Sequence, residues 1–177
     1  MMDKIQRQAG FNLMEAMIAG AVLAIAISIA LPSLTRLHRS HQVRATMFEL
    51  VAHLTLARST SIARGSTVAI CPSASSSECA IGHDWTSGWL VYADPDGNRK
   101  PDGSSDIIAS VRPTHSSTLS IRTTAGRTQV RYGSLGTTLG SNVTFNICQV
   151  GSLEAQVIVS IAGRPRFLRP QPQPCPS

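Results

Sequence analysis

The sequence predicts an α+β fold in which one long N-terminal helix packs on an antiparallel β-sheet head. Residues 16–31 are apolar and uncharged, and a helical spacing of apolar residues continues from there to Arg64. Beyond Ser66 this spacing disappears, and short β-rich runs alternate with Gly, Ser, Asp and Pro turn signals. The 177 residues suffice for one compact domain with an appendage. We call residues 65–177 the head.

The composition excludes intrinsic disorder and favours an anionic partner. Hydrophobic residues make up 42% of the chain and charged residues 15%, whereas disordered chains combine low hydrophobicity with high net charge. The net charge is +6, and residues 107–177, with seven arginines and the single acid Glu154, carry all of it. Such a surface suits nucleic acid or an anionic membrane.

The N-terminal segment has the properties of a membrane-inserting helix. About twenty helical residues cover roughly the 30 Å of a bilayer core. Lys4 and Arg7 precede the apolar run, which orients the N-terminus inside. Three interpretations remain at this point: a secretory signal peptide cut near residues 28–30, an uncleaved signal anchor, and a helix processed ahead of Phe11.

Glu15 favours the third interpretation, because it places a carboxylate one turn into the apolar helix. A charge inside a membrane costs about 2.5–3.5 kcal/mol at a helix centre, less near an end, and needs a partner. A cut after Gly10 would create an α-amino group on Phe11, close to Glu15. With Pro32, these residues resemble the prepilin motif of the type IV pilin family: a short basic leader, Gly, a cut, then Phe-x-x-x-Glu opening an apolar helix that contains a proline.

The resemblance implies how the N-terminus is processed and used. In that family a prepilin peptidase cuts after the residue matching Gly10, the new N-terminus at Phe11 is N-methylated, and Glu15 neutralises the N-terminal amine of a neighbouring subunit. Residues 1–10 would then be the leader peptide, and residues 11–34 the transmembrane and assembly half of the helix. Residues 35–64 would be its amphipathic half.

The amphipathic half is predicted from apolar residues at helical spacings: Leu34, Leu37, Met47, Leu50, Val51, Leu54 and Ala57. Gly65 after Arg64 is a C-cap signal. Strands are expected over residues 67–71, 88–93, 107–112, 119–123, 129–132, 143–148, 156–161 and 166–168.

The head resembles the FimT/GspH branch of minor pilins and pseudopilins. The residues that carry the likeness are Ala57-Arg58, Ala63-Arg64-Gly65, Cys71-Pro72-Ser73, Trp85, Gly88-Trp89-Leu90-Val91-Tyr92 and the stretch from Asp94 to Asp102. Near the end, Ala162-Gly163-Arg164-Pro165-Arg166 resembles the Gly-Arg-x-Arg element of the FimT type. In that type the element is associated with DNA capture during natural transformation.

Arg164 and Arg166 are therefore the first candidates for binding DNA. They are two positions apart and would project from one strand face, while Pro165 restricts the segment to an edge strand or an irregular stretch. Guanidinium groups bind phosphate, so recognition of double-stranded DNA would be independent of its sequence. Further candidates are Arg169, Arg122, Arg127 and Arg131. The alternative is a solvated basic face that aids solubility or packs against acidic neighbours.

The four cysteines are expected to form structural disulfides, since the head would lie outside the cytoplasm. Chain order suggests Cys71–Cys79 and Cys148–Cys175, one of three possible pairings. The spacings do not fit a zinc site, and residues 94–98 suit a turn better than a calcium loop. We expect no metal and no cofactor. Trp85, Trp89 and Tyr92 are expected to be buried anchors against the helix rather than base-stacking platforms.

The sequence shows no enzyme signature: there is no G-x-S-x-G, phosphate-binding loop or HExxH. The first hypothesis is a minor type IV pilin that binds extracellular DNA for natural transformation. Its partners would be other pilins, prepilin peptidase and the inner membrane, with the head in the periplasm before assembly into a pilus at the cell surface. The second is a GspH-type pseudopilin of a type II secretion system with no DNA role. The third is a secreted or anchored binding protein or hydrolase with an unrelated β domain.

Overall fold

The structure is a computed structural model that describes residues 12–75, 77–112, 118–171 and 173–176. The expected leader, including Gly10, and the expected new N-terminus at Phe11 lie outside the described residues. Contacts divide the chain into two compact units, Met1–Ser40 and His41–Ser177, and each is described by itself.

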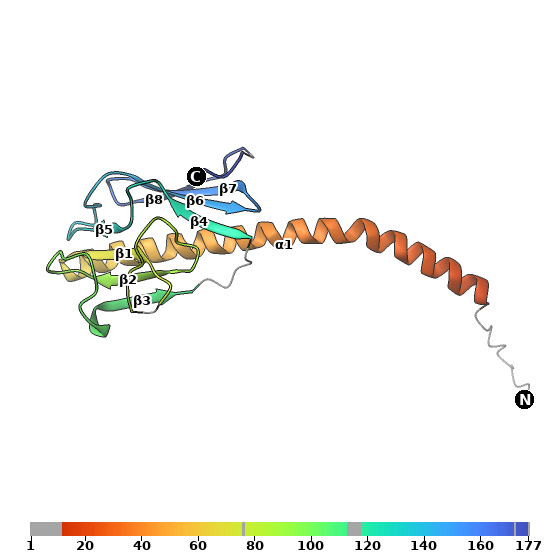
Figure 1. Cartoon of the computed structure of the whole chain (residues 1–177), viewed down its shortest axis with the longest axis horizontal. Coiled ribbons are helices and arrows are strands. Elements are labelled where there is room, and N and C mark those ends of the chain that lie inside the picture. The colour runs from red at the N-terminus through yellow and green to blue at the C-terminus, as the bar shows by residue number, and fades with distance from the viewer. Residues whose placement is uncertain (1–11, 76, 113–117, 172, 177) are drawn as a thin grey trace, which may run out of the picture. The chain divides into compact units, whose positions relative to one another are not determined.

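One continuous helix, α1 (Leu13–Arg64), takes part in both units (Figure 1). It ends at Gly65, whose φ of 63° is the left-handed conformation that a glycine adopts without strain. The N–H groups of Gly65 and Ser66 donate to the carbonyls of Ile62 and Ser61, both at 3.3 Å. This pair of bonds is a Schellman motif, and it confirms the predicted C-cap.

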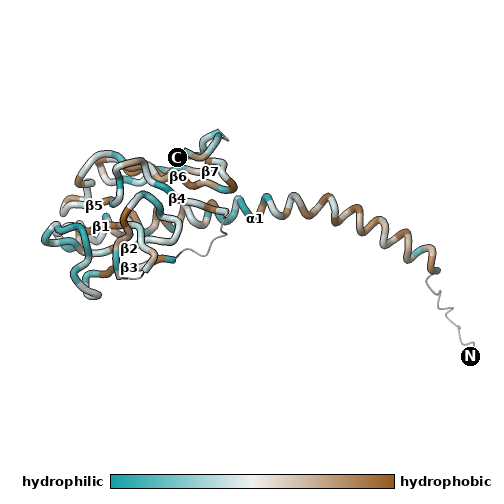
Figure 2. The backbone as a smooth tube through the Cα atoms, viewed as in Figure 1, coloured by the Kyte–Doolittle hydropathy of each residue, from teal (hydrophilic) through white to brown (hydrophobic). Residues whose placement is uncertain are grey.

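In the first unit, α1 exposes the apolar stretch of residues 16–31 (Figure 2). Leu13 is 78% exposed and Ile29 71%. Among the described residues, α1 is the one helix long and apolar enough to cross a membrane. An apolar surface of this extent requires lipid or other apolar helices around it.

The second unit contains two four-stranded antiparallel sheets beside the C-terminal part of α1. The first sheet has the order β3-β2-β1-β5 and consists of β1 (Val68–Pro72), β2 (Trp89–Ala93), β3 (Ile107–Val111) and β5 (Val130–Tyr132). The second has the order β4-β6-β7-β8 and consists of β4 (Leu119–Thr123), β6 (Val143–Gln149), β7 (Ser152–Val159) and β8 (Pro165–Leu168). A 3₁₀ turn, η1 (Ser104–Asp106), precedes β3.

Each predicted run contains a strand, and the largest difference is in β7. It begins at Ser152, four residues before the predicted start, and ends at Val159 rather than at residue 161. The hairpin turn before it consists of Val150 and Gly151, which have φ angles of 52° and 76°. Valine rarely adopts a positive φ, so Val150-Gly151 gives no turn signal in the sequence.

A single core fills the space between α1 and the inner faces of both sheets. The helix contributes Val43, Met47, Leu50, Leu54 and Ala57. Trp85 packs edge-on against Phe145, with ring centroids 4.9 Å apart, and Trp89 lies 6.0 Å from His53 of α1. Both tryptophans are therefore buried anchors, as predicted.

Tyr92 differs from the prediction, because it lies on the face of the first sheet that is turned away from α1. It belongs to a smaller cluster with Ala69, Cys71 and Leu90, against which Cys79 packs. The Cys71–Cys79 disulfide holds the intervening loop beside this cluster. The second disulfide joins Cys148 of β6 to Cys175 in the C-terminal tail. Both suggested pairings are present in the structure.

Candidate functional site

The second sheet has a continuous face directed away from the core, which we call the outer face. Residues directly opposite each other on antiparallel strands share a face, and the register therefore gathers Arg122, Thr144, Asn146, Gln156, Ile158, Arg166 and Leu168 on it. The Gln156 amide donates to the side-chain oxygen of Asn146 at 2.8 Å. None of these seven residues is acidic, but the exposed Glu154, which alternates with the buried Leu153 and Ala155 in β7, points to the same side. With Arg122 and Arg166 against this one acid, the face retains an excess of positive charge.

Arg122 and Arg166 lie on the two edge strands of this face. Arg166 of β8 stands opposite Ile158 of β7, and Arg122 of β4 stands opposite Asn146 of β6. Three strand spacings of about 4.8 Å, or roughly 14 Å, separate the two edge strands, and the register offsets the two arginines by a further two residues along the strands. The neighbour of Arg166, Phe167, points the other way and meets Phe48 of α1, with ring centroids 6.1 Å apart. This contact fixes the orientation of β8.

Arg164 lies outside β8, in the loop between β7 and β8. The predicted common strand face for Arg164 and Arg166 is therefore not formed, because the chain is still turning at Gly163. The Gly163 N–H donates to the Ser160 carbonyl at 2.8 Å, and its φ is 76°. The loop is also held by Thr138, whose N–H donates to the Ile161 carbonyl at 2.9 Å. A fixed loop thus presents the exposed Arg164 side chain.

A side chain at residue 163 would not fit the loop. A Cβ there would lie 2.0 Å from the Gly136 carbonyl oxygen and 3.2 Å from Nε of Arg58. The same Nε donates to the Gly136 carbonyl at 2.9 Å. The glycine of the Gly-Arg-x-Arg element is therefore required by packing against α1 and the residue 136 loop.

Four of the six candidate arginines are exposed: Arg122, Arg164, Arg166 and Arg169. Within the described part of the chain, none of the four forms an ion pair or a side-chain hydrogen bond. The other two differ, since the Arg127 guanidinium donates to the Ser141 hydroxyl and Arg131 pairs with Asp94.

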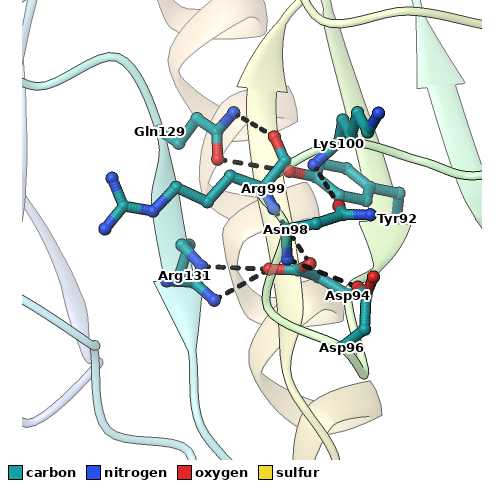
Figure 3. A network of polar contacts seen from close by, with 8 residues as sticks. All are labelled: Tyr92, Asp94, Asp96, Asn98, Arg99, Lys100, Gln129 and Arg131. Carbon is teal, nitrogen blue, oxygen red and sulfur yellow. Dashed lines mark hydrogen bonds and ion pairs between the residues drawn. The ribbon is translucent and has the colours of Figure 1, made fainter.

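Asp94 is buried at the end of β2 and organises a polar network (Figure 3). One of its oxygens receives Arg131, through Nε at 3.1 Å and through a terminal nitrogen at 2.9 Å. The other accepts the backbone N–H of Arg99 at 3.1 Å. Burial raises the pKa of Tyr92, and the nearby Asp94 carboxylate raises it further. The Tyr92 hydroxyl donates to Gln129 at 3.2 Å.

The C-terminal tail borders Arg122. The Cys148–Cys175 bond and hydrogen bonds from the N–H groups of Leu153 and Cys175, both 2.9 Å, hold the tail beside β7. Pro176 then lines a cavity of about 420 Å³ together with Arg122. The disulfide therefore sets part of the surroundings of this candidate arginine.

Residues 94–98 form a turn, and the side chain of Asp96 accepts the Asn98 N–H at 3.3 Å. In the described ranges no three potential metal ligands come together. Glu15 lies exposed in the first turn of α1. The structure adds Arg99, which is not among the six arginines selected from the sequence, because it lines one cavity with Arg127 and Arg131. No sequence signal indicates that it lies beside Arg127 and Arg131.

Comparison with known proteins gives a family and a fold. A sequence profile of the family described as "Type II transport protein GspH" matches residues 48–163. A crystal structure of the type IV minor pilin FimU from Pseudomonas aeruginosa is similar, with a TM-score of 0.61, 20% identity, and coverage of 75% of this chain and 95% of that one. A second crystal form of FimU matches with a TM-score of 0.53 and 23% identity, over 73% of this chain and 98% of that one. No curated protein matches the chain.

Proposed function

The chain belongs to the GspH family of type II transport proteins and has the fold of a type IV minor pilin, and on this premise we propose that it is a minor pilin that binds extracellular double-stranded DNA. The bound DNA would be taken up in natural transformation. The observation that carries this proposal is the set of four exposed arginines on and beside the outer face that have no ion-pair partner among the described residues: Arg122, Arg164, Arg166 and Arg169.

These arginines suit a phosphate backbone better than base edges. They come from two sheet edges, a turn and the start of the tail. Within the described ranges the helical elements are α1 and the short turn η1, and neither follows these strands as a recognition helix for a major groove. Guanidinium groups placed in this way neutralise phosphates without reading sequence. Arg127 and Arg131 would contribute less, because Ser141 and Asp94 already engage them.

The proposal includes assembly through the N-terminal part of the chain. Prepilin peptidase would cut after Gly10, Phe11 would be N-methylated, and the exposed Glu15 would pair with the N-terminal amine of a neighbouring pilin. Before assembly residues 11–34 would lie in the inner membrane, with the head in the periplasm. After assembly the same apolar surface would be buried among the helices of other pilins in a pilus at the cell surface.

A DNA titration tests the proposal. We would use the full chain in a non-ionic detergent with a short DNA duplex at about 50 and about 200 mM salt, a range over which binding through several phosphates weakens steeply. In the double variant Arg164→Gln/Arg166→Gln we expect weaker binding at both salt concentrations. The slope of log affinity against log salt should also fall by about 2, since each lost phosphate contact removes about 0.9.

A second double variant supplies the matched control. Arg64→Gln/Arg112→Gln removes the same charge from exposed positions away from β8 and should retain most of the binding. An equal loss of DNA affinity in both double variants would mean that net charge alone, and not the position of the arginines, determines binding. A folded, oxidised chain that fails to bind DNA at low salt would refute the proposal.

The second candidate is a pseudopilin that contacts only other pilins. The exposed pair of Phe48 and Phe167, which are 56% and 53% exposed, favours it, because aromatic residues are enriched in protein interfaces. Loss of assembly in Phe48→Ser, with DNA binding absent from the parent chain, would support this candidate.

A further inference from the structure

A second cluster of arginines lines a cavity beside β5. The cavity has a volume of about 160 Å³ and is lined by Arg99, Gly126, Arg127, Thr128, Gln129, Arg131 and Leu139. The three arginines come from three places in the chain: the loop after β2, the loop before β5, and β5 itself. None of the described residues that line this cavity is acidic.

Asp94 neutralises one of the three charges but does not block the cavity. Both of its oxygens are occupied, one by the Arg131 guanidinium and the other by the Arg99 N–H. Its side chain is fully buried, so it is not available to a ligand. The cavity therefore keeps an excess of two positive charges, which equals the charge of a phosphate dianion.

The main chain of Arg99 is held in an unfavourable conformation. Its φ is 69°, which costs a non-glycine residue roughly 1–2 kcal/mol. Two contacts maintain it: the bond from its N–H to Asp94, and a bond of 2.8 Å from the Gln129 amide to its carbonyl. In the described ranges its guanidinium has no hydrogen-bond partner. In Figure 3 this side chain extends away from Asp94, past Gln129 and Arg131.

Arg127 is fixed by neighbouring polar groups as well. Its N–H donates to the Thr124 carbonyl at 3.1 Å, and its carbonyl accepts the Thr123 hydroxyl at 2.5 Å. Its guanidinium donates to the Ser141 hydroxyl, which leaves further N–H groups available. Two of the three guanidinium groups are thus positioned by other side chains, and a ligand would order fewer groups on binding.

We propose that this cavity binds a phosphate group through Arg99, Arg127 and Arg131. Guanidinium forks match the oxygens of phosphate with charge-assisted bonds, and Thr128 lies at the same wall to supply a hydroxyl. The site does not depend on DNA binding by the outer face. Its ligand is either free phosphate and phosphomonoesters or a phosphodiester.

Calorimetric titration of the full chain in a non-ionic detergent with inorganic phosphate tests the site. We expect saturable binding of one phosphate per chain. Arg99→Gln and Arg127→Gln should each weaken it by about 10-fold or more, the range for hydrogen bonds to charged groups. Arg131 is left unchanged, because its removal would strand the buried Asp94 carboxylate and destabilise the fold.

Arg64→Gln is the control, since it removes one exposed arginine that belongs neither to the cavity nor to the proposed DNA-binding set, and it should leave phosphate binding unchanged. Equal weakening in Arg64→Gln, or no saturation by phosphate, would overturn the proposal, and so would acetate binding as tightly as phosphate. A titration with dimethyl phosphate separates the two sources: tighter binding of dimethyl phosphate assigns the site to a phosphodiester, and tighter binding of phosphate assigns it to a free or terminal phosphate. Loss of DNA binding in Arg164→Gln/Arg166→Gln with phosphate binding retained would separate this site from the proposed function.

Discussion

The two tyrosines of the chain, Tyr92 and Tyr132, are both fully buried, but their hydroxyl groups have different surroundings. The Tyr92 hydroxyl donates to Gln129 at 3.2 Å, whereas the Tyr132 hydroxyl has no hydrogen-bond partner among the described residues. A buried hydroxyl without a partner costs free energy that a phenylalanine would not. We therefore expect Tyr132→Phe to leave the free energy of unfolding at neutral pH unchanged or slightly higher.

The same substitution should change the response to alkali. Burial raises the pKa of both tyrosines above the ordinary value of 10.0. Above pH 10 the unfolded chain has released protons that the folded chain still holds, so stability falls as pH rises. Each tyrosine contributes a slope of about 1.4 kcal/mol per pH unit. Urea unfolding between about pH 8 and 11 should show half the tyrosine slope in Tyr132→Phe. A slope equal to that of the parent chain would contradict this assignment.

The sequence does not reveal which charged residues form ion pairs when the two partners are far apart in the chain. The arginines of the tail could be identified from spacing and charge, and four of the six candidates are exposed. Arg131 was chosen on the same grounds, yet its partner Asp94 lies 37 positions earlier. Only the pairing of β1 with both β2 and β5 brings the two together. Charge counts contain no information on that pairing.

At the scale of elements, the loop between β7 and β8 sets where Arg164 points. Its turn depends on Gly163, which combines a φ of 76° with a Cβ position 2.0 Å from the Gly136 carbonyl oxygen. Gly126 is a matched control, because its φ is 80° but nothing lies within 4 Å of its Cβ position. Gly126→Ala should cost about 1–2 kcal/mol of unfolding free energy from backbone strain alone. Gly163→Ala should cost clearly more.

The two alanine variants also differ in their expected effect on DNA binding. Gly163→Ala must displace either the residue 136 loop or the turn that presents Arg164, so it should weaken any DNA binding that depends on Arg164. Gly126→Ala should not. Chemical denaturation and the DNA titration measure both effects, and equal stability losses in the two variants would show that the loop yields to a methyl group at little cost.

The elements predicted from the sequence differ in how well their ends were placed. β4 was predicted at residues 119–123 and occupies Leu119–Thr123, because its alternation of buried and exposed residues follows one buried face. β7 was placed too late, since the turn at Val150 and Gly151 uses a residue type that avoids positive φ. The cysteine pairs followed from chain order alone, which succeeds here because each cysteine is bonded to the next cysteine along the chain, at separations of 8 and 27 residues.

At the scale of the whole molecule, the periodic apolar residues predicted which side of α1 is buried but not where burial begins. Leu34 and Leu37 continue the apolar spacing, yet they are 58% and 54% exposed. Among the residues whose burial is described, the first buried side chain is Val43, and contacts divide the chain after Ser40. Helical spacing specifies which side of α1 is buried. How much of that side the sheets cover depends on their topology, which the sequence did not reveal.

Truncation should therefore separate two parts of one helix. A fragment of residues 35–177 retains every buried apolar residue of the described core, which begins at Val43. We expect it to unfold at the same denaturant midpoint as the full chain in non-ionic detergent.

A fragment of residues 52–177 lacks Val43, Met47 and Leu50 and leaves the inner faces of both sheets uncovered at that end. Each lost side chain removes about 1.5–3 kcal/mol of burial energy, against a typical total stability of about 5–15 kcal/mol. This shorter fragment should show no cooperative transition in circular dichroism, even with both disulfides formed. A cooperative transition near the parent midpoint would mean that the sheets are stable without this part of α1, and the helix would then serve assembly alone.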